Sequence, residues 1–317
     1  MSEELNNLCF GPPGSENRNT GTFLNRRNQR LFCRYWFPTG NHQTCSPKAL
    51  VFLCHGFCEH LANYHSIGEA LAAEGVLAFG HDHVGHGRSE GIRAYIDTVD
   101  EYVDDLIDHC MEIRGRYDSN IPLFMVAHSM GGMVAIRAAI SHPRFFRGMV
   151  LVGPLVIPGQ TVFGVLDFRV TPFRAVAARL VLRLLDTWNP QLVLGYVDYD
   201  LVTREEPIKR LLAEDELRWQ GGTKVHLLIA FVNCLEENLS MMGGLRVPFL
   251  VLHGDNDGLC NVEGSRLLKR YALVKDKELI EFSGASHQLF LELPHVRNLT
   301  VDESVKWITN RIETLDG

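Results

Sequence analysis

The amino-acid sequence predicts an α/β fold with a mostly parallel central sheet, helices on both faces and an inserted helical cap. Strand-length apolar runs predict the sheet; they span residues 49–56, 75–82, 122–129, 148–154 and 248–255. Continuous apolar runs of this length are typical of parallel strands that helices bury on both faces. Residues 31–37 are expected to add an antiparallel strand at the edge of the sheet.

Helical stretches lie between these runs. Apolar residues recur at helical spacing over residues 100–117 and 133–143. Residues 300–315 open with Thr300 and Glu303, which have the spacing of a capping box, so a closing helix is expected to begin there. Strands alternating with helices in this way predict an open α/β sheet, with its site at the carboxyl ends of the strands.

The segment 155–245 breaks the alternation, and we interpret it as a cap inserted into the sheet domain. The core then consists of residues 21–154 and 246–317. Residues 1–20 are rich in Gly, Asn and Glu and are expected to form a flexible tail. The same stretch lacks an apolar signal core and a cluster of positive charge, so no signal peptide is expected.

One predicted helix of the cap, within residues 168–190, has Arg174, Arg179 and Arg183 dispersed among apolar residues. An ordinary core helix rarely carries so many arginines. Two interpretations remain open. The helix either packs in the cap with its arginines extending to solvent, or it is exposed and partly hydrophobic and rests on lipid.

The composition of the 317-residue chain, 46% hydrophobic and 22% charged, is that of a globular protein with a sizeable core. The net charge of −7 gives no basis for nucleic acid as a partner. The eight cysteines are scattered, several of them inside apolar runs, which favours a reducing compartment. No apolar run reaches the roughly 18–20 residues of a membrane span. We therefore expect a cytoplasmic protein.

The stretch Ala127-His128-Ser129-Met130-Gly131 lies where a predicted strand meets a predicted helix, and it resembles the nucleophile elbow G-x-S-x-G. A sharp turn at this junction exposes the serine hydroxyl and directs the following N–H groups towards the reaction centre. The turn requires small neighbours, because the strand and the helix come close together. Gly131 meets this requirement fully, and Ala127 adds one methyl group. Ser129 is therefore the predicted nucleophile.

A serine nucleophile needs a base and an acid that orients the base, expected in the chain order Ser, Asp, His. Asp255 and Asp257 both follow a predicted strand, and spacing alone does not choose between them because one can simply cap the turn. His287 follows the next strand and a Ser-Gly-Ala turn, and is the predicted base. His295 follows a proline and is expected at the surface.

The oxyanion of acyl transfer needs two backbone donors. Met130, directly after the serine, supplies one N–H group. Phe57 follows a predicted strand and the pair His55-Gly56, so its N–H group is expected to supply the other.

Histidines 81, 83 and 86 offer an alternative, because His-x-Asp-x-His occurs in hydrolytic zinc sites. A metal enzyme would leave Ser129, Asp257 and His287 in triad order by coincidence, so we expect no metal. The sequence has neither a Gly-x-Gly-x-x-Gly nor a Walker motif, and no cofactor is expected.

Seven motifs, in order along the chain, resemble the monoglyceride lipase family of the α/β-hydrolase fold. They are LFCRYWFPTG, HGFCEH, FGHDHVGHGRSEG, AHSMGG, GMVLVGPLV, VPFLVLHGDNDGLC and GASHQLFLELP. The resemblance extends from about residue 30 to about residue 310 and is weakest in the cap.

The resemblance implies that Asp257, rather than Asp255, is the acid that orients His287. It also implies that the His-Asp-His stretch is a structural loop and that Cys260 matches a cysteine that reacts with thiol reagents. The cap resembles a lid that docks on membranes and opens an apolar tunnel for the acyl chain. For Ser129, and for the donors at Phe57 and Met130, it implies the roles already predicted.

The alcohol pocket departs from the family pattern. Glu59 and Tyr64 are kept as substrate-binding residues, but Asn63 replaces an arginine and Phe290 replaces a second histidine that helps to recognise glycerol. The acyl-transfer residues thus appear intact, whereas the pocket for the alcohol is expected to be less polar.

Three further departures surround the acyl-transfer residues. The oxyanion residue, commonly alanine, is the bulkier Phe57; Cys58 replaces a glycine, and Ala127 replaces the first glycine of the elbow.

The function expected from these residues is hydrolysis of monoacylglycerols to a free fatty acid and glycerol. The alternatives are a lysophospholipase or broad carboxylesterase, favoured by Asn63 and Phe290, and a non-catalytic lipid-binding α/β-hydrolase, favoured if Phe57 crowds the site. The expected partners are a monoacylglycerol or related lipid ester, a membrane surface reached through the cap, and a second copy of the chain in a homodimer.

Overall fold

A computed structural model describes residues 19–40, 46–159 and 172–313, without the side chains of residues 172–177. The tail predicted for residues 1–20 lies almost entirely outside this range. An eight-stranded sheet forms the centre, in the order β1-β2-β4-β3-β5-β6-β9-β10. Its strands are β1 (Thr20–Leu24), β2 (Arg30–Trp36), β3 (Leu50–Cys54), β4 (Leu77–His81), β5 (Leu123–His128), β6 (Gly148–Val152), β9 (Phe249–Gly254) and β10 (Lys277–Phe282).

Within this sheet the neighbours from β4 through β3, β5, β6 and β9 to β10 pair in parallel, whereas β1 with β2 and β2 with β4 pair antiparallel. The five apolar runs predicted as strands are β3, β4, β5, β6 and β9. The predicted edge position of residues 31–37 is wrong, because β1 pairs with the outer side of β2 from Thr20↔Arg34 to Leu24↔Arg30. The polar sequence of β1, with only Phe23 buried, gives it no apolar run to mark it.

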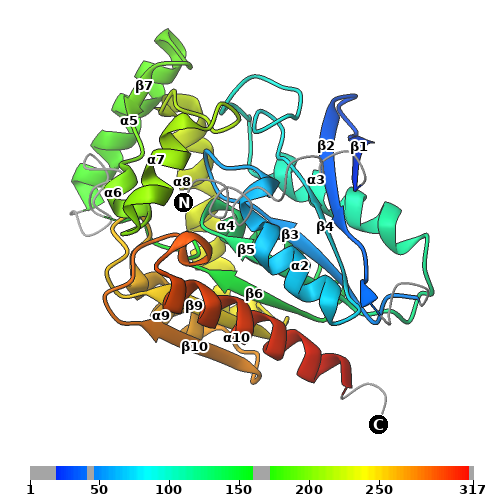
Figure 1. Ribbon diagram of the computed structural model, residues 1–317. Helices are drawn as coiled ribbons and strands as arrows, with labels where there is room; N and C mark the ends of the chain where they lie inside the picture. The colour runs from blue at the N-terminus through cyan, green and yellow to red at the C-terminus, as the bar shows by residue number, and fades with distance from the viewer. Residues whose placement is uncertain (1–18, 41–45, 160–171, 314–317) are drawn as a thin grey trace.

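Helices cover both faces of the sheet (Figure 1). One face carries α2 (His65–Ala73) and α10 (Pro294–Glu313), together with the short helices η3 (Leu61–Tyr64) and η5 (Leu289–Leu291). The other carries α3 (Asp100–Arg114), α4 (Met130–Ser141), α8 (Val225–Met241) and α9 (Val262–Tyr271). Strand side chains alternate between the two cores: in β3, Leu50 and Phe52 belong to the second and Val51 and Leu53 to the first.

The closing helix α10 begins at Pro294, six residues before the predicted capping box. Proline suits the first turn of a helix, because its missing N–H group would have no partner there. Thr300 lies inside the helix, where its hydroxyl donates to the Val296 carbonyl at 2.8 Å. The capping-box prediction is therefore wrong: the hydroxyl bonds to the preceding turn of the helix.

Several elements separate β6 from β9 in the chain. They are α5 (Pro172–Trp188), β7 (Val193–Gly195), α6 (Tyr199–Val202), α7 (Glu206–Glu214), β8 (Thr223–Lys224), α8 and η4 (Met242–Gly244). Most of them gather at one end of the molecule (Figure 1). Leu182 of α5 packs on Val225, Leu228 and Val232 of α8. On another side of α8, Leu227 and Phe231 join the core of the sheet, so α8 connects this helical region to the sheet.

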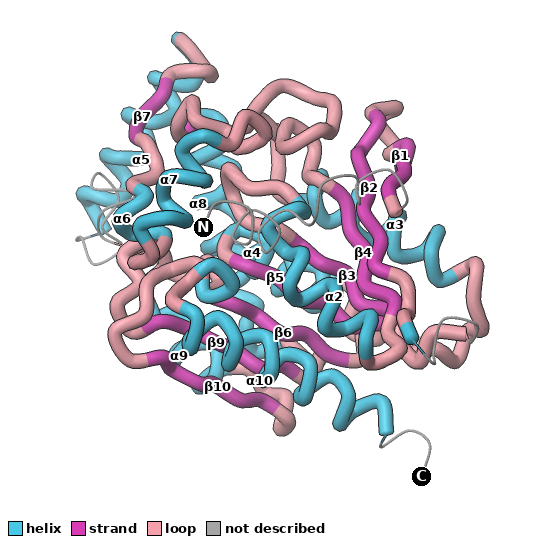
Figure 2. The backbone as a smooth tube through the Cα atoms, in the orientation of Figure 1, coloured by secondary structure: helices cyan, strands magenta, loops and turns pink. Residues whose placement is uncertain are grey.

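Residues 82–99, between β4 and α3, form neither helix nor strand (Figure 2). Among the described helices, none is both long enough and apolar enough to cross a membrane. The six cysteines of the described ranges are buried and free, as expected for cysteines that act as small apolar side chains.

Candidate active site

Ser129 occupies a strained junction between β5 and α4. Its backbone has φ 54° and ψ −120°, in a region that residues other than glycine rarely adopt. Such strain is typical of a nucleophile elbow, where a sharp turn lifts the serine above the sheet. Met130 is the first residue of α4, so its N–H group has no partner within the helix.

The elbow depends on close contact between α4 and β3. A Cβ atom on Gly131 would lie 2.2 Å from the carbonyl oxygen of Cys54, so no larger residue fits there without a shift of the backbone. Ala127 is fully buried in the core and pairs with Cys54 across the sheet. The fold therefore accommodates the extra methyl group before the serine, whereas the position after it requires glycine.

Asp257 and His287 form a buried hydrogen-bonded pair. His287 Nδ1 lies 2.7 Å from Asp257 Oδ2, while Asp257 Oδ1 accepts the N–H groups of Leu259 and Cys260, each at 2.8 Å. Burial alone would raise the pKa of Asp257, but the charge of His287 and hydrogen bonds from His253 and His287 outweigh it and hold that pKa well below its usual range. Asp257 is therefore ionised at neutral pH and orients the His287 ring.

Asp255 lies apart from this pair. It is exposed, and its Oδ1 accepts the N–H group of Gly284 at 2.6 Å, which ties together two loops after neighbouring strands. His295 is exposed, as predicted. Of the two aspartates that the sequence left open, the structure thus brings Asp257 to His287 and gives Asp255 a turn-forming contact.

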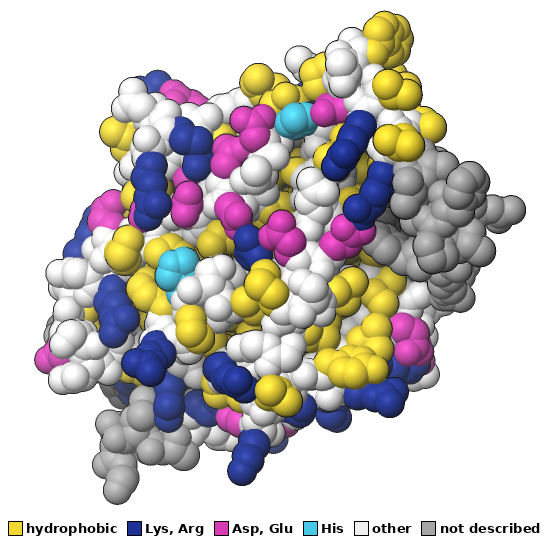
Figure 3. Space-filling view, turned by 180° about the vertical axis from the view of Figure 1, so that it is seen from behind, with side chains coloured by type: hydrophobic (Ala, Val, Ile, Leu, Met, Phe, Trp, Pro, Cys, Tyr) yellow, Lys and Arg dark blue, Asp and Glu magenta, His cyan; other side chains and the backbone are white. Residues whose placement is uncertain are grey.

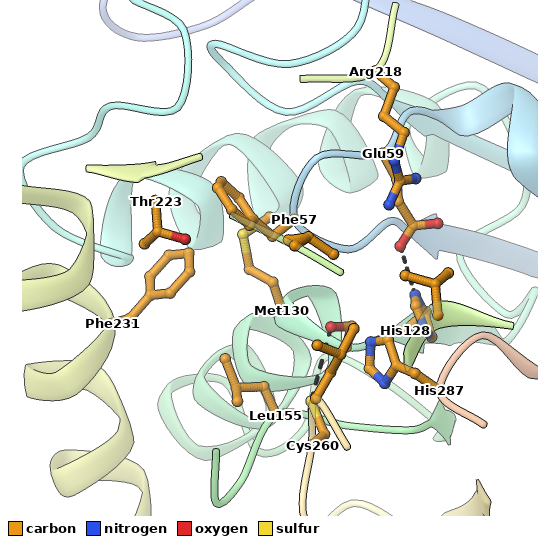
Figure 4. Close-up of a pocket in the computed structure, with 14 residues that line it drawn as sticks. Phe57, Glu59, His128, Met130, Leu155, Arg218, Thr223, Phe231, Cys260 and His287 are labelled. Atoms are coloured by element: carbon orange, nitrogen blue, oxygen red, sulfur yellow. Dashed lines mark hydrogen bonds and ion pairs between the residues drawn. The ribbon is translucent and has the colours of Figure 1, made fainter. Parts of the chain in front are cut away.

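A cavity joins the elbow to the His–Asp pair (Figure 4). It encloses about 610 Å³ of empty space, part of it open to solvent, and both Ser129 and His287 line it. Its apolar wall includes Leu155, Val202, Phe231 and Leu259. The remaining polar lining consists of Glu59, His128, Arg218 and Thr223.

Phe57, in the loop after β3, and Met130, directly after the serine, both line this cavity. The Phe57 ring packs edge-to-face on Phe231, with ring centroids 6.0 Å apart. Cys58, directly after it, has φ 67°, in the left-handed region that favours glycine. A cysteine thus occupies a position whose backbone conformation suits the glycine of the family pattern.

The loop that carries Phe57 is fastened to the segment between α7 and β8. The Trp219 N–H group donates to the Cys58 carbonyl at 3.0 Å. His60 Nε2 lies 2.7 Å from Asp215 Oδ2, with both side chains almost fully buried. Two contacts therefore hold the loop in place from the side of the inserted helices.

Glu59 is the centre of a buried hydrogen-bond network. Its carboxylate accepts from Gln288 Nε2 at 2.6 Å and from the Tyr64 hydroxyl at 3.3 Å, and lies 2.7 Å from His128 Nδ1. Burial would raise the pKa of Glu59, but His128 and, to a smaller extent, Arg218 bring it down to about 2. The approach to His128 requires Gly56, where a Cβ atom would lie 2.3 Å from a Glu59 oxygen.

The four predicted substrate-binding residues occupy two different places. Glu59 lines the cavity, whereas Asn63, Tyr64 and Phe290 do not appear in its lining. These three are buried, and the rings of Tyr64 and Phe290 pack together in the core on the α2 side of the sheet. The departures at Asn63 and Phe290 therefore lie behind the cavity wall in this structure.

Cys260 lines the cavity with its sulfur 3.9 Å from the Ser129 hydroxyl. Burial, and then the charge of Asp257, raise the pKa of its thiol well above the ordinary value. Thiolate is the reactive form of cysteine. A thiol reagent could therefore reach Cys260 through the cavity, but the raised pKa keeps the thiol in its less reactive, protonated form. The reactivity of Cys260 stays a prediction.

Histidines 81, 83 and 86 are fully buried beside the core. The His83 N–H group donates to His55 Nε2 at 2.8 Å, and His81 Nδ1 lies 3.1 Å from His109 Nδ1. Among the described residues, the one group with metal-ligand spacing is Asp257, Cys260 and His287, and Asp257 and His287 are already hydrogen-bonded to each other there.

Sequence reasoning missed three polar residues of the cavity: His128, Arg218 and Thr223. His128 stands inside the elbow motif and was visible there as a polar interruption of an apolar strand. Arg218 and Thr223 lie in the segment after α7, about 90 residues from the serine, and belong to no motif. Only the fold brings them to Ser129.

A serine elbow beside a buried His–Asp pair, at the carboxyl ends of parallel strands, defines the class of α/β-hydrolases that use a serine. The family model described as serine aminopeptidase, S33, matches residues 45–294. Human monoglyceride lipase is 36% identical over 92% of this chain and 90% of its own length. A monoglyceride lipase homologue of monkeypox virus is 32% identical over 93% of this chain and 99% of its own.

Solved structures agree with these relatives. Monoacylglycerol lipase of Paleococcus ferrophilus has a TM-score of 0.73 and 27% identity, with 89% of this chain and 99% of that one covered. Monoglyceride lipase of Saccharomyces cerevisiae, in complex with a substrate analogue, has the same fold, with a TM-score of 0.73, 22% identity, and 94% and 98% of the two chains covered. The chain belongs to the monoglyceride lipase family of α/β-hydrolases, and it is a serine ester hydrolase.

Proposed function

We propose that this enzyme cleaves monoacylglycerols to a free fatty acid and glycerol, with Ser129 as nucleophile, His287 as base and Asp257 as the acid that orients it. The observation that carries the proposal is the buried His287–Asp257 pair, 2.7 Å between Nδ1 and Oδ2, in the same cavity as the strained Ser129. Relatives named monoglyceride lipase, aligned over nine-tenths of the chain, support the choice of substrate.

The protonation states support a two-step reaction. Because Asp257 is ionised, it accepts a hydrogen bond from the Nδ1–H group of His287, which leaves Nε2 without a proton and free to remove that of the Ser129 hydroxyl. The serine oxygen attacks the ester carbonyl, and the N–H groups of Phe57 and Met130 stabilise the resulting oxyanion.

Collapse of the tetrahedral intermediate breaks the ester bond, and His287 protonates the departing glycerol oxygen. Water then attacks the acyl-enzyme with the same base, and the fatty acid leaves as Ser129 regains its proton. The apolar wall formed by Leu155, Phe231 and Leu259 suits the acyl chain.

The proposal includes peripheral contact of a cytoplasmic protein with membranes, through α5. Leu180, Leu184 and Trp188 are 56%, 70% and 76% exposed and recur every four residues on one side of this helix. Figure 3 shows apolar and basic side chains together on the corner of the molecule that carries these elements. A partly hydrophobic helix of this kind suits the surface of a bilayer. Self-association into a homodimer stays a prediction, which sedimentation of the purified protein tests.

The first test measures fatty-acid release from a monoacylglycerol and from the matching lysophosphatidylcholine. We expect the monoacylglycerol to be preferred, and Ser129→Ala to lower kcat by several orders of magnitude. Faster release from the lysophospholipid would instead identify a lysophospholipase, and equal rates a broad carboxylesterase. Near-normal turnover of Ser129→Ala would remove the triad from the proposal.

A second measurement addresses a non-catalytic lipid-binding protein, which Phe57 would produce if its ring blocked the site. A fluorophosphonate forms a covalent bond only with an activated serine. We expect labelling of the wild-type protein and none of Ser129→Ala. An unlabelled wild-type protein would favour the non-catalytic alternative.

A further inference from the structure

The ionisable side chains of the cavity gather at one end, whereas Thr223 lies beside Phe231 at the other. Figure 4 shows Arg218 reaching towards Glu59 on the same side of the pocket as His128 and His287, with Phe231 on the opposite side. In the proposed reaction His287 protonates the departing alcohol, so the alcohol must lie within reach of its ring. The end of the cavity with Arg218, Glu59 and His128 is therefore the place for the alcohol.

Two of these side chains each bury one nitrogen atom that has no hydrogen-bond partner among the described residues. Arg218 is 5% exposed, and its Nε–H group donates to no atom of the described residues. His128 is 1% exposed, and its Nε2 is likewise unpartnered within the described chain. An unmade hydrogen bond of a buried polar atom is unfavourable, so both atoms favour a ligand that completes them.

The missing contacts of the two residues are of opposite kinds. Glu59 is ionised, with a pKa of about 2, and can only accept hydrogen bonds, so the His128 nitrogen that faces it, Nδ1, carries the proton. Burial lowers the pKa of His128 and keeps the ring neutral, which leaves Nε2 as an acceptor. Arg218 Nε can only donate. A hydroxyl group, which donates one hydrogen bond and accepts others, suits both.

The charge of Arg218 is already balanced. Its guanidinium lowers the pKa of Glu59 and of Asp215, so two carboxylates lie within electrostatic reach of it. His60 lies against Asp215, and His128 is neutral. The negative charge of the carboxylates at this end of the cavity equals or exceeds the positive charge of the single guanidinium. This end therefore offers hydrogen bonds but no net positive charge. An anionic head group would gain little from Arg218 and would be repelled by Glu59.

We propose that Arg218 and His128 form the head-group site, in which Arg218 donates to and His128 accepts from a hydroxyl of an uncharged alcohol. The inference rests on the proposed function and deepens it: the preferred substrates are esters of neutral polyols, and phosphate-bearing alcohols are discriminated against. Arg218 is then a specificity-determining residue contributed by the segment between α7 and β8.

The test compares three esters of one fatty acid: the monoacylglycerol, the ethyl ester and the monoacylglycerol phosphate. The ethyl ester keeps the acyl chain and the scissile bond but lacks the hydroxyl groups. We expect the wild-type enzyme to have a higher kcat/KM for the monoacylglycerol than for either of the others. We expect Arg218→Met to lower the ratio of monoacylglycerol to ethyl ester by about 10- to 100-fold.

The ratio is the quantity to measure, because Arg218→Met also leaves Glu59 without a counter-charge and any general loss of activity cancels. Arg210→Met, which replaces an exposed arginine of α7, is the matched control and should keep both rates and the ratio. The wild-type comparison with the phosphate ester needs no variant, so it decides the charge part of the proposal even if Arg218→Met does not fold.

An unchanged ratio in Arg218→Met, or faster cleavage of the phosphate ester by the wild-type enzyme, would overturn the head-group site while leaving the lipase function intact. A wild-type enzyme that cleaves none of the three esters would refute the proposed function itself, and the head-group site with it.

Discussion

At the scale of single residues, two aspartates separated by one position have opposite surroundings. Asp257 is buried and accepts two backbone N–H groups in addition to its contact with His287. Asp255 is exposed and accepts a hydrogen bond from the N–H group of Gly284 in a turn. In the proposed mechanism the same carboxylate chemistry orients a base at Asp257, whereas at Asp255 it closes a turn.

We predict that Asp257→Asn lowers kcat by about 10⁴-fold, because an amide cannot hold the His287 tautomer that accepts the serine proton. Asp255→Asn is the matched control and should change kcat by less than about threefold, since an amide oxygen still accepts from Gly284. Steady-state kinetics on a monoacylglycerol measures both. A larger loss in Asp255→Asn would mean that the wrong acid has been assigned.

The residues proposed for acyl transfer could be selected from the sequence because each one ends or follows a strand, and strand ends meet at one edge of a parallel sheet. The choice of Asp257 needed the family resemblance, since spacing left both aspartates open. Arg218 could not be predicted, because it belongs to the segment 155–245, where the apolar pattern has no strand ends to mark a site. Asn63 and Phe290 were predicted to bind substrate only from their positions in a motif, and both lie behind the wall of the cavity.

At the scale of elements, α5 carries features of both interpretations that the sequence left open. Leu182 packs on α8, and Arg179 forms an ion pair with Glu236 of that helix. Leu184 and Trp188 nevertheless stay exposed. Of the arginines in the predicted lipid-facing set, Arg183 is exposed, and the side chain of Arg174 lies outside the described residues. The helix thus packs along one line and exposes an apolar stripe along another.

We predict that replacing Leu184 and Trp188 together with aspartate lowers the affinity for phospholipid vesicles by about tenfold or more, because apolar area no longer enters the bilayer surface. Vesicle co-sedimentation measures the binding. The control is Met111→Asp, which places an aspartate at an exposed apolar position of α3, away from α5. Equal binding by the double variant and the control would assign α5 to the protein core alone.

At the scale of the whole molecule, several histidine side chains are buried in their neutral form. Five of the buried rings are those of His55, His81, His83, His86 and His109. Burial lowers the pKa of all five, to about 4 for His86 and about 3 for His109, and well below the ordinary 6.5 for the others. In the unfolded chain each of these histidines would bind a proton as the pH falls through about 6.5, whereas in the folded protein it stays neutral until a lower pH.

Stability is therefore complete above about pH 6.5 and is lost as the pH falls below it, because the unfolded state gains protons first. Each histidine that stays neutral costs about 2 kcal/mol at pH 5, and several together rival the 5–15 kcal/mol that typically holds a domain folded. We predict a steep fall in the free energy of unfolding between pH 6.5 and pH 5, measured by urea titration. A flat profile would contradict it; His295→Gln, at an exposed position, should leave the profile unchanged.

The loop of Phe57 belongs to the sheet domain but is also held by the inserted segment. Trp219 bonds to Cys58, and Asp215 bonds to His60. If the inserted segment moved away from the sheet, these contacts with the loop of the proposed oxyanion donor would break. In the proposed mechanism, a displaced inserted segment would leave the Phe57 N–H group without these supports, so the contacts that shape the cavity from above also fix an oxyanion donor.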